Sequence, residues 1–147
     1  MTALTVHGEV GAPRSDRERS YTFSHAFRSG RLVHVFGMLA IDERGQLLAD
    51  DLVGQTRVIY RRLGELLDEL AASPARVIKT TDYITTTDGY RKTADIRREF
   101  FGSHRPASTG VVVAGLLHAQ ALIEIDAVVV LDGTDTGVFE VSTREGP

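Results

Sequence analysis

Residues Arg105–Leu131, RPASTGVVVAGLLHAQALIEIDAVVVL, decide the fold of this chain. They contain two apolar runs of the kind that forms strands, Gly110–Val113 and Ala121–Leu131, joined by a loop. Glu124 and Asp126 lie inside the second run. Because a buried carboxylate is costly unless it is paired, hydrogen-bonded or used in chemistry, this acidic pair marks the segment as a candidate site.

The composition of the 147-residue chain is that of one globular domain. The net charge of −3 gives no reason to expect a nucleic acid or an anionic membrane as a partner. The chain has no cysteine, which excludes disulfides and thiol chemistry. No apolar run approaches the roughly 20 residues of a membrane span, and the N-terminus does not read as a signal peptide. We therefore expect a cytoplasmic enzyme or binding domain.

Alternation, helical spacing and turn signals predict an α+β domain over residues 21–131, between an irregular lead-in (1–20) and a tail (132–147). Ser29-Gly30 joins the first two strands as a hairpin, and Gly37 within the second strand indicates a bulge or a close backbone approach. The predicted elements are strands over Tyr21–Arg28, Leu32–Met38, Val77–Thr85 and the two runs above, with helices from about 51 to 72 and 89 to 101.

The order ββαβαββ predicts a mixed sheet with two helices on one face. In the last strand the odd positions from Ile123 to Val129 are wholly apolar and belong under the helices. The even face, which carries Glu124 and Asp126, is otherwise apolar too. Two helices cover one face only, so we expect copies of the chain to cover the other in a homo-oligomer, with the carboxylates at the interface.

Glu124 and Asp126 lie about 6.6–6.8 Å apart along one strand face, a separation that suits a pair handling water or a proton. The simpler interpretation is that Asp126 forms a structural ion pair and that Glu124 lines a solvent channel. The five histidines show no metal-binding spacing, and no nucleotide or dinucleotide motif is present, so we expect neither metal nor cofactor. His25 and His118 are kept as candidate site residues, although packing roles are the simpler interpretation.

Two further clusters have both functional and plain interpretations. Ser108, Thr109 and Gly110 offer hydroxyls and backbone N–H groups that suit an oxyanion or carboxylate, and they equally suit a turn. The basic residues around the second helix, among them Arg97 and Arg105, are typical of a solvated surface.

Several segments together resemble the Rid (YjgF-like) family over about residues 23–131. They are SHAFRSGRLVHVFG, GQTRVIYRRLGELL, VIKTTDYIT, the FFG that ends the second helix, PAST and IEIDAVVVL. The resemblance implies a chorismate-mutase-like α+β fold and a homotrimer with sites in the clefts between subunits. It also implies hydrolysis of reactive enamines and imines, such as 2-aminoacrylate, to keto acids and ammonia.

The resemblance implies a site that this chain has altered. The family's glutamate, thought to handle the catalytic water, is kept as Glu124, and its strand glycine as Gly37. The residues that replace the family's tyrosine, serine, asparagine and substrate-clamping arginine are, in that order, Phe23, Phe36, Ala94 and Ser108. Losing the arginine forfeits a bidentate carboxylate contact, so we expect a less cationic and more aromatic pocket that prefers a neutral or larger apolar substrate.

Three functions follow as hypotheses. The first is an enzyme in which Glu124 is the general acid/base on an imine, enamine or related unsaturated molecule, with its pKa raised by an apolar pocket. Backbone N–H groups near Gly37 and Ser108–Gly110 would then hold a developing oxyanion. The second is a non-catalytic trimer that binds a small ligand or a partner protein. The third is an ordinary 2-iminopropionate-type deaminase, ranked lower because Ser108 stands in the place of the arginine.

Overall fold

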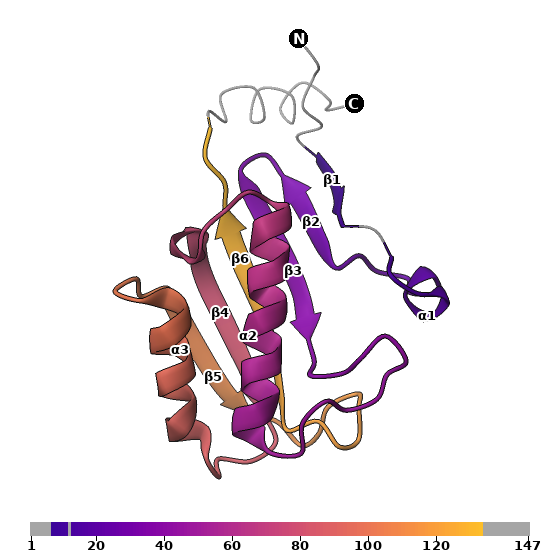
Figure 1. Ribbon diagram of the computed structural model, residues 1–147, viewed down its shortest axis with the longest axis vertical. Helices are drawn as coiled ribbons and strands as arrows, with labels where there is room; N and C mark the ends of the chain where they lie inside the picture. Colours follow the sequence, from indigo (N-terminus) through magenta and orange to yellow (C-terminus); the bar gives the residue numbers. More distant parts are fainter. Residues whose placement is uncertain (1–6, 12, 134–147) are drawn as a thin grey trace, which may run out of the picture.

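The computed structural model describes residues 7–11 and 13–133 of the chain, and Figure 1 shows one sheet with α2 and α3 in front of it. The described strands are β1 (His7–Val10), β2 (Ala26–Ser29), β3 (Leu32–Met38), β4 (Val77–Ile84), β5 (Ala107–Val112) and β6 (Ile123–Val130). The helices are α1 (Asp16–Arg19), α2 (Leu52–Glu69) and α3 (Thr93–Phe101), with 3₁₀ turns at Pro74–Arg76 and Tyr90–Lys92.

The sheet is mixed and has the strand order β1-β2-β3-β6-β4-β5. Only β4 and β5 pair in parallel, and the other neighbours are antiparallel. The segment Arg105–Leu131 supplies both the central strand β6 and the edge strand β5, which explains why it decides the fold. The predicted α+β class is confirmed.

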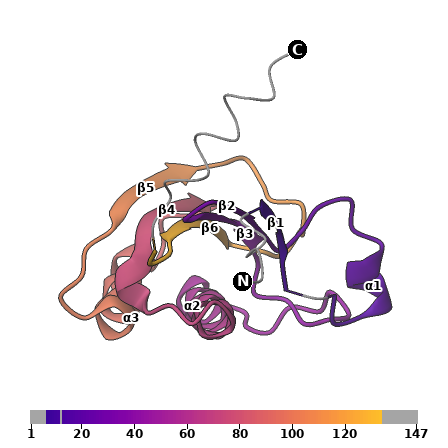
Figure 2. The same ribbon diagram turned by 90° about the horizontal axis from the view of Figure 1, so that it is seen from above.

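The core lies between the sheet and the two long helices, which occupy the same side of the sheet in Figure 2. The odd positions of β6 are buried and the even positions are half-buried, as the alternation predicts. Helix α2 contributes a buried stripe that includes Ile59, Leu63 and Leu67. It begins after Asp51, whose carboxylate accepts a hydrogen bond from the N–H of Gly54 at 2.7 Å, an N-cap of the expected kind.

The N-terminal segment differs from the prediction. Within the described residues of the lead-in, β1 pairs with β2, and α1 forms a single helical turn capped by Ser15. The first predicted strand was placed too early, because pairing with β3 begins near His25, whose carbonyl accepts from the N–H of Phe36 at 2.9 Å. The alternating aromatic residues from Tyr21 follow α1 instead and pack their rings together.

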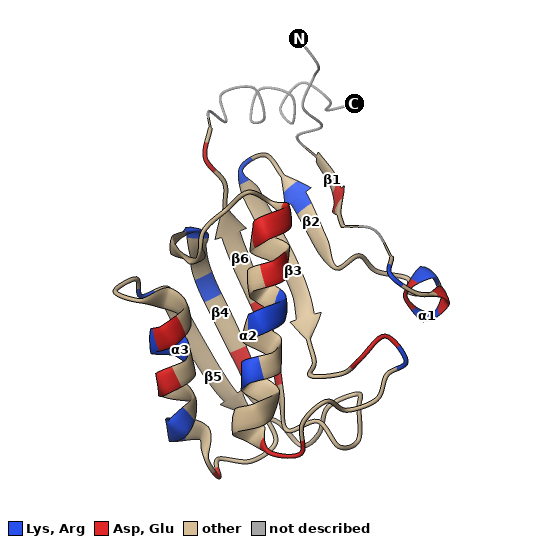
Figure 3. Cartoon of the chain, in the orientation of Figure 1, with Lys and Arg blue, Asp and Glu red and all other residues tan. Residues whose placement is uncertain are grey.

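The sheet face opposite α2 and α3 is called the open face, since no helix of the described residues covers it (Figure 2). It carries the even positions of β6, together with Tyr83 of β4. Charged residues gather mainly on the helices and loops (Figure 3). No helix of the described part of the chain combines the length and apolar character needed to cross a bilayer.

Candidate active site

A pocket of about 480 Å³ lies where β3 and β6 meet the segment that follows α1. The pocket brings together six of the residues that the sequence predicts for the site. They are Phe23, His25, Phe36, Gly37, His118 and Glu124. One chain alone therefore brings Glu124 together with Phe23 and Phe36, the two aromatic residues that stand where the family has tyrosine and serine.

Gly37 is where β3 departs from regular pairing with β6, in a register shift between Val35 and Met38. A Cβ built on Gly37 would lie 1.9 Å from Oε1 of Glu124 and 2.8 Å from its Cδ. The carboxylate of Glu124 thus occupies the space that any other residue at position 37 would fill. The predicted bulge and the predicted close approach are both present.

The two carboxylates of β6 have different surroundings. Asp126 accepts a hydrogen bond from the hydroxyl of Tyr83 at 3.1 Å, and it forms no ion pair among the described residues. Glu124 forms no hydrogen bond or ion pair with any side chain or backbone group of the described residues. Burial, and then the charge of Asp126, raise the pKa of Glu124 above its ordinary value. This is the direction expected of a carboxyl group that exchanges protons near neutral pH.

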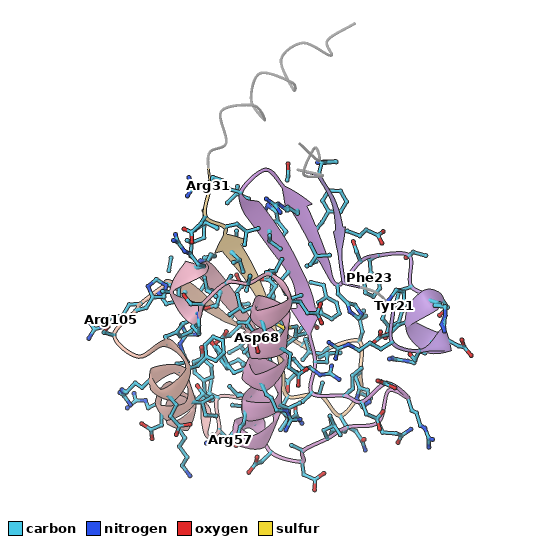
Figure 4. The ribbon with its side chains drawn as sticks, turned by 45° about the horizontal axis from the view of Figure 1, so that its top comes forward. Tyr21, Phe23, Arg31, Arg57, Asp68 and Arg105 are labelled. Atoms are coloured by element: carbon cyan, nitrogen blue, oxygen red, sulfur yellow. The ribbon has the colours of Figure 1, made fainter. Side chains whose placement is uncertain are left out.

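Four rings form one side of the pocket and are called the aromatic wall: Tyr21, Phe23, Phe36 and His25. Tyr21 stacks on Phe23 with centroids 4.7 Å apart, and His25 stacks on Phe36 at 4.6 Å. The two pairs meet where Phe23 lies 6.4 Å from Phe36. Phe23 remains 57% exposed, and Figure 4 shows it beside Tyr21, next to α1. Four aromatic rings thus line this pocket, and that it is more aromatic than the family's usual pocket stays a prediction.

Two arginines, Arg17 of α1 and Arg62 of α2, line the pocket together with three carboxylates, Glu18, Asp42 and Glu124. That the pocket is less cationic than the family's usual one stays a prediction. Arg62 donates to the carbonyl oxygens of Leu39 (3.1 Å) and Ile41, which fixes the loop after β3. The carboxylate of Glu18, also at the pocket, accepts a hydrogen bond from the N–H of Arg14 at 2.6 Å. Sequence reasoning missed these residues because Arg17 and Glu18 come from the segment predicted as an irregular lead-in, and because no motif marks Arg62 within its helix.

The two candidate histidines have packing partners. Nε2 of His118 lies 3.1 Å from the carbonyl oxygen of Gly45, so it carries the proton and donates. Nδ1 of His118 accepts from the N–H of Gln120 at 3.3 Å, so both ring nitrogens are in use. Nε2 of His25 lies 3.7 Å from Oε1 of Glu18. These contacts favour positioning roles for both rings.

Four predicted residues do not line this pocket in the single chain. Ser108, Thr109 and Gly110 lie within β5, paired with β4, rather than in a turn before a strand. Thr109 accepts from Nζ of Lys79 at 2.5 Å, and the hydroxyl of Ser108 lies 3.4 Å from Oγ1 of Thr80. Ala94 lines a separate hollow beside α3.

That hollow is basic, with Arg97, Arg98 and Arg105 among its lining residues. Figure 4 shows Arg105 on the other side of the molecule from Tyr21 and Phe23. Within residues 7–11 and 13–133, no three histidine, aspartate or glutamate side chains gather as a metal site would require. In the pocket, the carboxyl group of Glu124 lies among aromatic rings and two arginines, Arg17 and Arg62.

Comparison with known proteins identifies the family to which the chain belongs. The family model described as "Endoribonuclease L-PSP" matches residues 16–131. A RutC family protein of Pyrococcus abyssi is 31% identical over 107 residues, which cover 72% of this chain and 84% of that protein. The Reactive Intermediate Deaminase A, chloroplastic, of Arabidopsis thaliana is 28% identical over 132 residues, 89% of this chain and 70% of that protein.

A solved structure gives the same result. The crystal structure of a member of the YjgF/YER057c/UK114 family from Mycobacterium tuberculosis superposes with a TM-score of 0.71 and 30% identity, covering 85% of this chain and 99% of that one. The family match over residues 16–131 agrees with the α+β sheet. The matched range includes Gly37 and Glu124, which lie beside each other. The chain belongs to the Endoribonuclease L-PSP family, the family of the YjgF and Rid proteins.

Proposed function

We propose that this protein is an enzyme in which Glu124 is the general acid/base for hydrolysis of an imine, an enamine or a related unsaturated small molecule. The observation that carries the proposal is the half-buried carboxylate of Glu124, which has a raised pKa and no partner among the described residues. It faces a pocket with an aromatic wall. A relative's printed name, Reactive Intermediate Deaminase A, supports the same class of reaction.

The proton steps follow from this position. As the oxygen of a water molecule bonds to the imine carbon, the carboxylate of Glu124 accepts a proton from that water. The acid then gives this proton to the nitrogen, which forms a carbinolamine. Glu124 next takes the hydroxyl proton of the carbinolamine and passes it to the amino nitrogen, so the carbon–nitrogen bond breaks as the carbonyl forms, and ammonia leaves. One imine and one water thus yield one carbonyl compound and one ammonia, and Glu124 returns to its starting state. A pKa raised by burial helps one group to serve in both steps.

We also propose that the working form is a homotrimer whose sites open onto the contacts between subunits. The open face exposes apolar side chains, including Leu32 and Val111. All six residues of β5 are exposed, so this edge strand is available to a neighbouring copy. Ser108–Gly110 would then be able to complete the pocket of that neighbour. Chromatography with light scattering tests the stoichiometry, and a monomer at working concentrations would contradict it.

The description of the family model names an endoribonuclease, but the pocket does not favour RNA. Affinity for RNA depends on cations that neutralise phosphates. Two arginines line this pocket, but three carboxylates, Glu18, Asp42 and Glu124, line it as well. The overall charge of −3 points the same way. A small molecule is the better substrate.

Ammonia release from a panel of imines and enamines, small and aromatic, tests the function on wild type and Glu124→Gln. The proposal predicts turnover of at least one member, best with an apolar body, and its loss in the variant. Fastest turnover of 2-iminopropionate would instead support the ordinary deaminase. Saturable binding without turnover of any member would support the non-catalytic trimer, and unchanged turnover in Glu124→Gln would exclude this mechanism.

A further inference from the structure

Arg17 is the feature of the pocket that the proposed reaction does not use. It lies on α1, is exposed, and lines the same pocket as Glu124. No carboxylate of the described residues lies within ion-pair distance of it, whereas its neighbours in the lead-in are paired. Arg14 lies 3.2 Å from Glu69, and Arg19 lies 3.5 Å from Asp16. Arg17 therefore presents a guanidinium charge to the pocket without an acidic partner from the described chain.

Contacts hold this guanidinium in place without neutralising it. NH1 of Arg17 donates to the hydroxyl of Tyr21 at 2.6 Å, and its Cζ lies 5.5 Å from the centroid of the same ring. The group also lies against Gly45, where an added Cβ would lie 3.0 Å from Cζ. Gly45 has a φ of +82°, which favours glycine, and the closeness of Arg17 leaves little space for a Cβ there. A group positioned in advance loses less entropy on binding, which strengthens its contact with a ligand.

The other charged groups near Arg17 are already engaged. Arg62 uses its donors on the carbonyl oxygens of the loop after β3. The carboxylate of Glu18 has the backbone N–H of Arg14 as a partner and lies close to His25. Arg17 is thus the cation best placed to meet a negatively charged part of a ligand in this pocket.

We infer that Arg17 is a specificity residue that binds a carboxylate of the substrate while the stacked Tyr21–Phe23 pair takes its apolar body. This inference rests on the proposed function for the identity of the pocket and sharpens it toward imines or enamines that carry both a carboxylate and an aromatic or large apolar group. A planar guanidinium matches a carboxylate with two parallel hydrogen bonds. The position of Arg17 in α1 is unrelated in sequence to that of Ser108 in β5.

Binding of a product-like pair of compounds, measured by isothermal titration calorimetry on the full chain, tests the inference without requiring turnover. The pair is 2-oxo-3-phenylpropanoate and its methyl ester, which differ in the negative charge. Wild type should bind the acid more tightly than the ester. Arg17→Gln should weaken binding of the acid by roughly 10- to 100-fold and change binding of the ester by less than about 3-fold, the range expected for a charge-assisted hydrogen bond.

Arg19→Gln is the matched control, because it removes the same charge from the same helix at a residue that does not line the pocket. It should leave both affinities unchanged, and Arg17→Lys should restore part of the preference for the acid. The inference is overturned if wild type does not prefer the acid, or if Arg17→Gln weakens acid and ester equally. Repeating the titration in Glu124→Gln separates the two proposals, since the preference should persist there even if Glu124 has no catalytic role.

Discussion

Replacing Gly37 with alanine tests how closely activity depends on the position of the Glu124 carboxylate. The added Cβ would lie 1.9 Å from Oε1 of Glu124, whereas an ordinary contact begins near 3.4 Å. The carboxylate must therefore retreat by about 1.5 Å. Since a misplacement of about 1 Å can cost on the order of 100-fold in rate, we expect kcat of Gly37→Ala to fall by about that factor.

The stability of Gly37→Ala should change far less than its activity. The atoms that a new Cβ meets belong to the end of a flexible side chain on the pocket side, so the free energy of unfolding should fall by no more than about 1 kcal/mol. Urea denaturation measures this, alongside kcat on the imine that wild type turns over best. Gly115→Ala is the control, because a Cβ there meets no atom within 4 Å. Wild-type kcat in Gly37→Ala would refute the reasoning.

Three stability predictions follow from buried groups. Tyr90→Phe removes the hydroxyl that donates to buried Asp82 at 2.7 Å and should lower the free energy of unfolding by about 1–3 kcal/mol. The control, Tyr83→Phe on the open face, should lower it by less than about 0.5 kcal/mol. Equal urea midpoints of the two variants would contradict this. Burial raises the pKa of Asp82 above 3.8, so its protonated form favours the fold, and wild-type stability should fall as pH rises through that higher value. Asp82→Asn should reduce this fall between pH 4 and 8, and an identical pH profile would count against it. Gly64→Ala should add about 0.5–1 kcal/mol in thermal unfolding, because a Cβ there lies an ordinary 3.5 Å from Phe100 and glycine is a weak helix former; a lower Tm would show strain instead.

Much of the fold could be predicted because its long elements have strong periodicity. The alternation in β6 identified the buried face, and helical spacing placed the start of α2 near residue 51. The strand β1 and the helix α1 have four residues each, too few for a period to show. They depend on pairing with β2 and on contacts of Arg14 with α2, which are visible only in three dimensions.

Part of the candidate site could be predicted because it lies on strands with clear periodicity. Glu124, Gly37 and Phe36 lie on adjacent strands, where pairing brings them together. Arg17 and Tyr21 reach the pocket only because α1 folds back beside it, and nothing in local spacing reports that contact. Ser108 lies in the edge strand β5 and is not among the residues that line the pocket of one chain.

The most direct test of the account is the kcat of Glu124→Gln set against that of Asp126→Asn, on a substrate that wild type hydrolyses. Both substitutions remove a carboxylate from the same face of β6, but Asp126 has the Tyr83 hydroxyl as its partner. The account predicts a loss of about 100- to 10,000-fold for Glu124→Gln, with substrate binding retained, and less than about 10-fold for Asp126→Asn. Equal losses in the two variants, or wild-type turnover in Glu124→Gln, would contradict it.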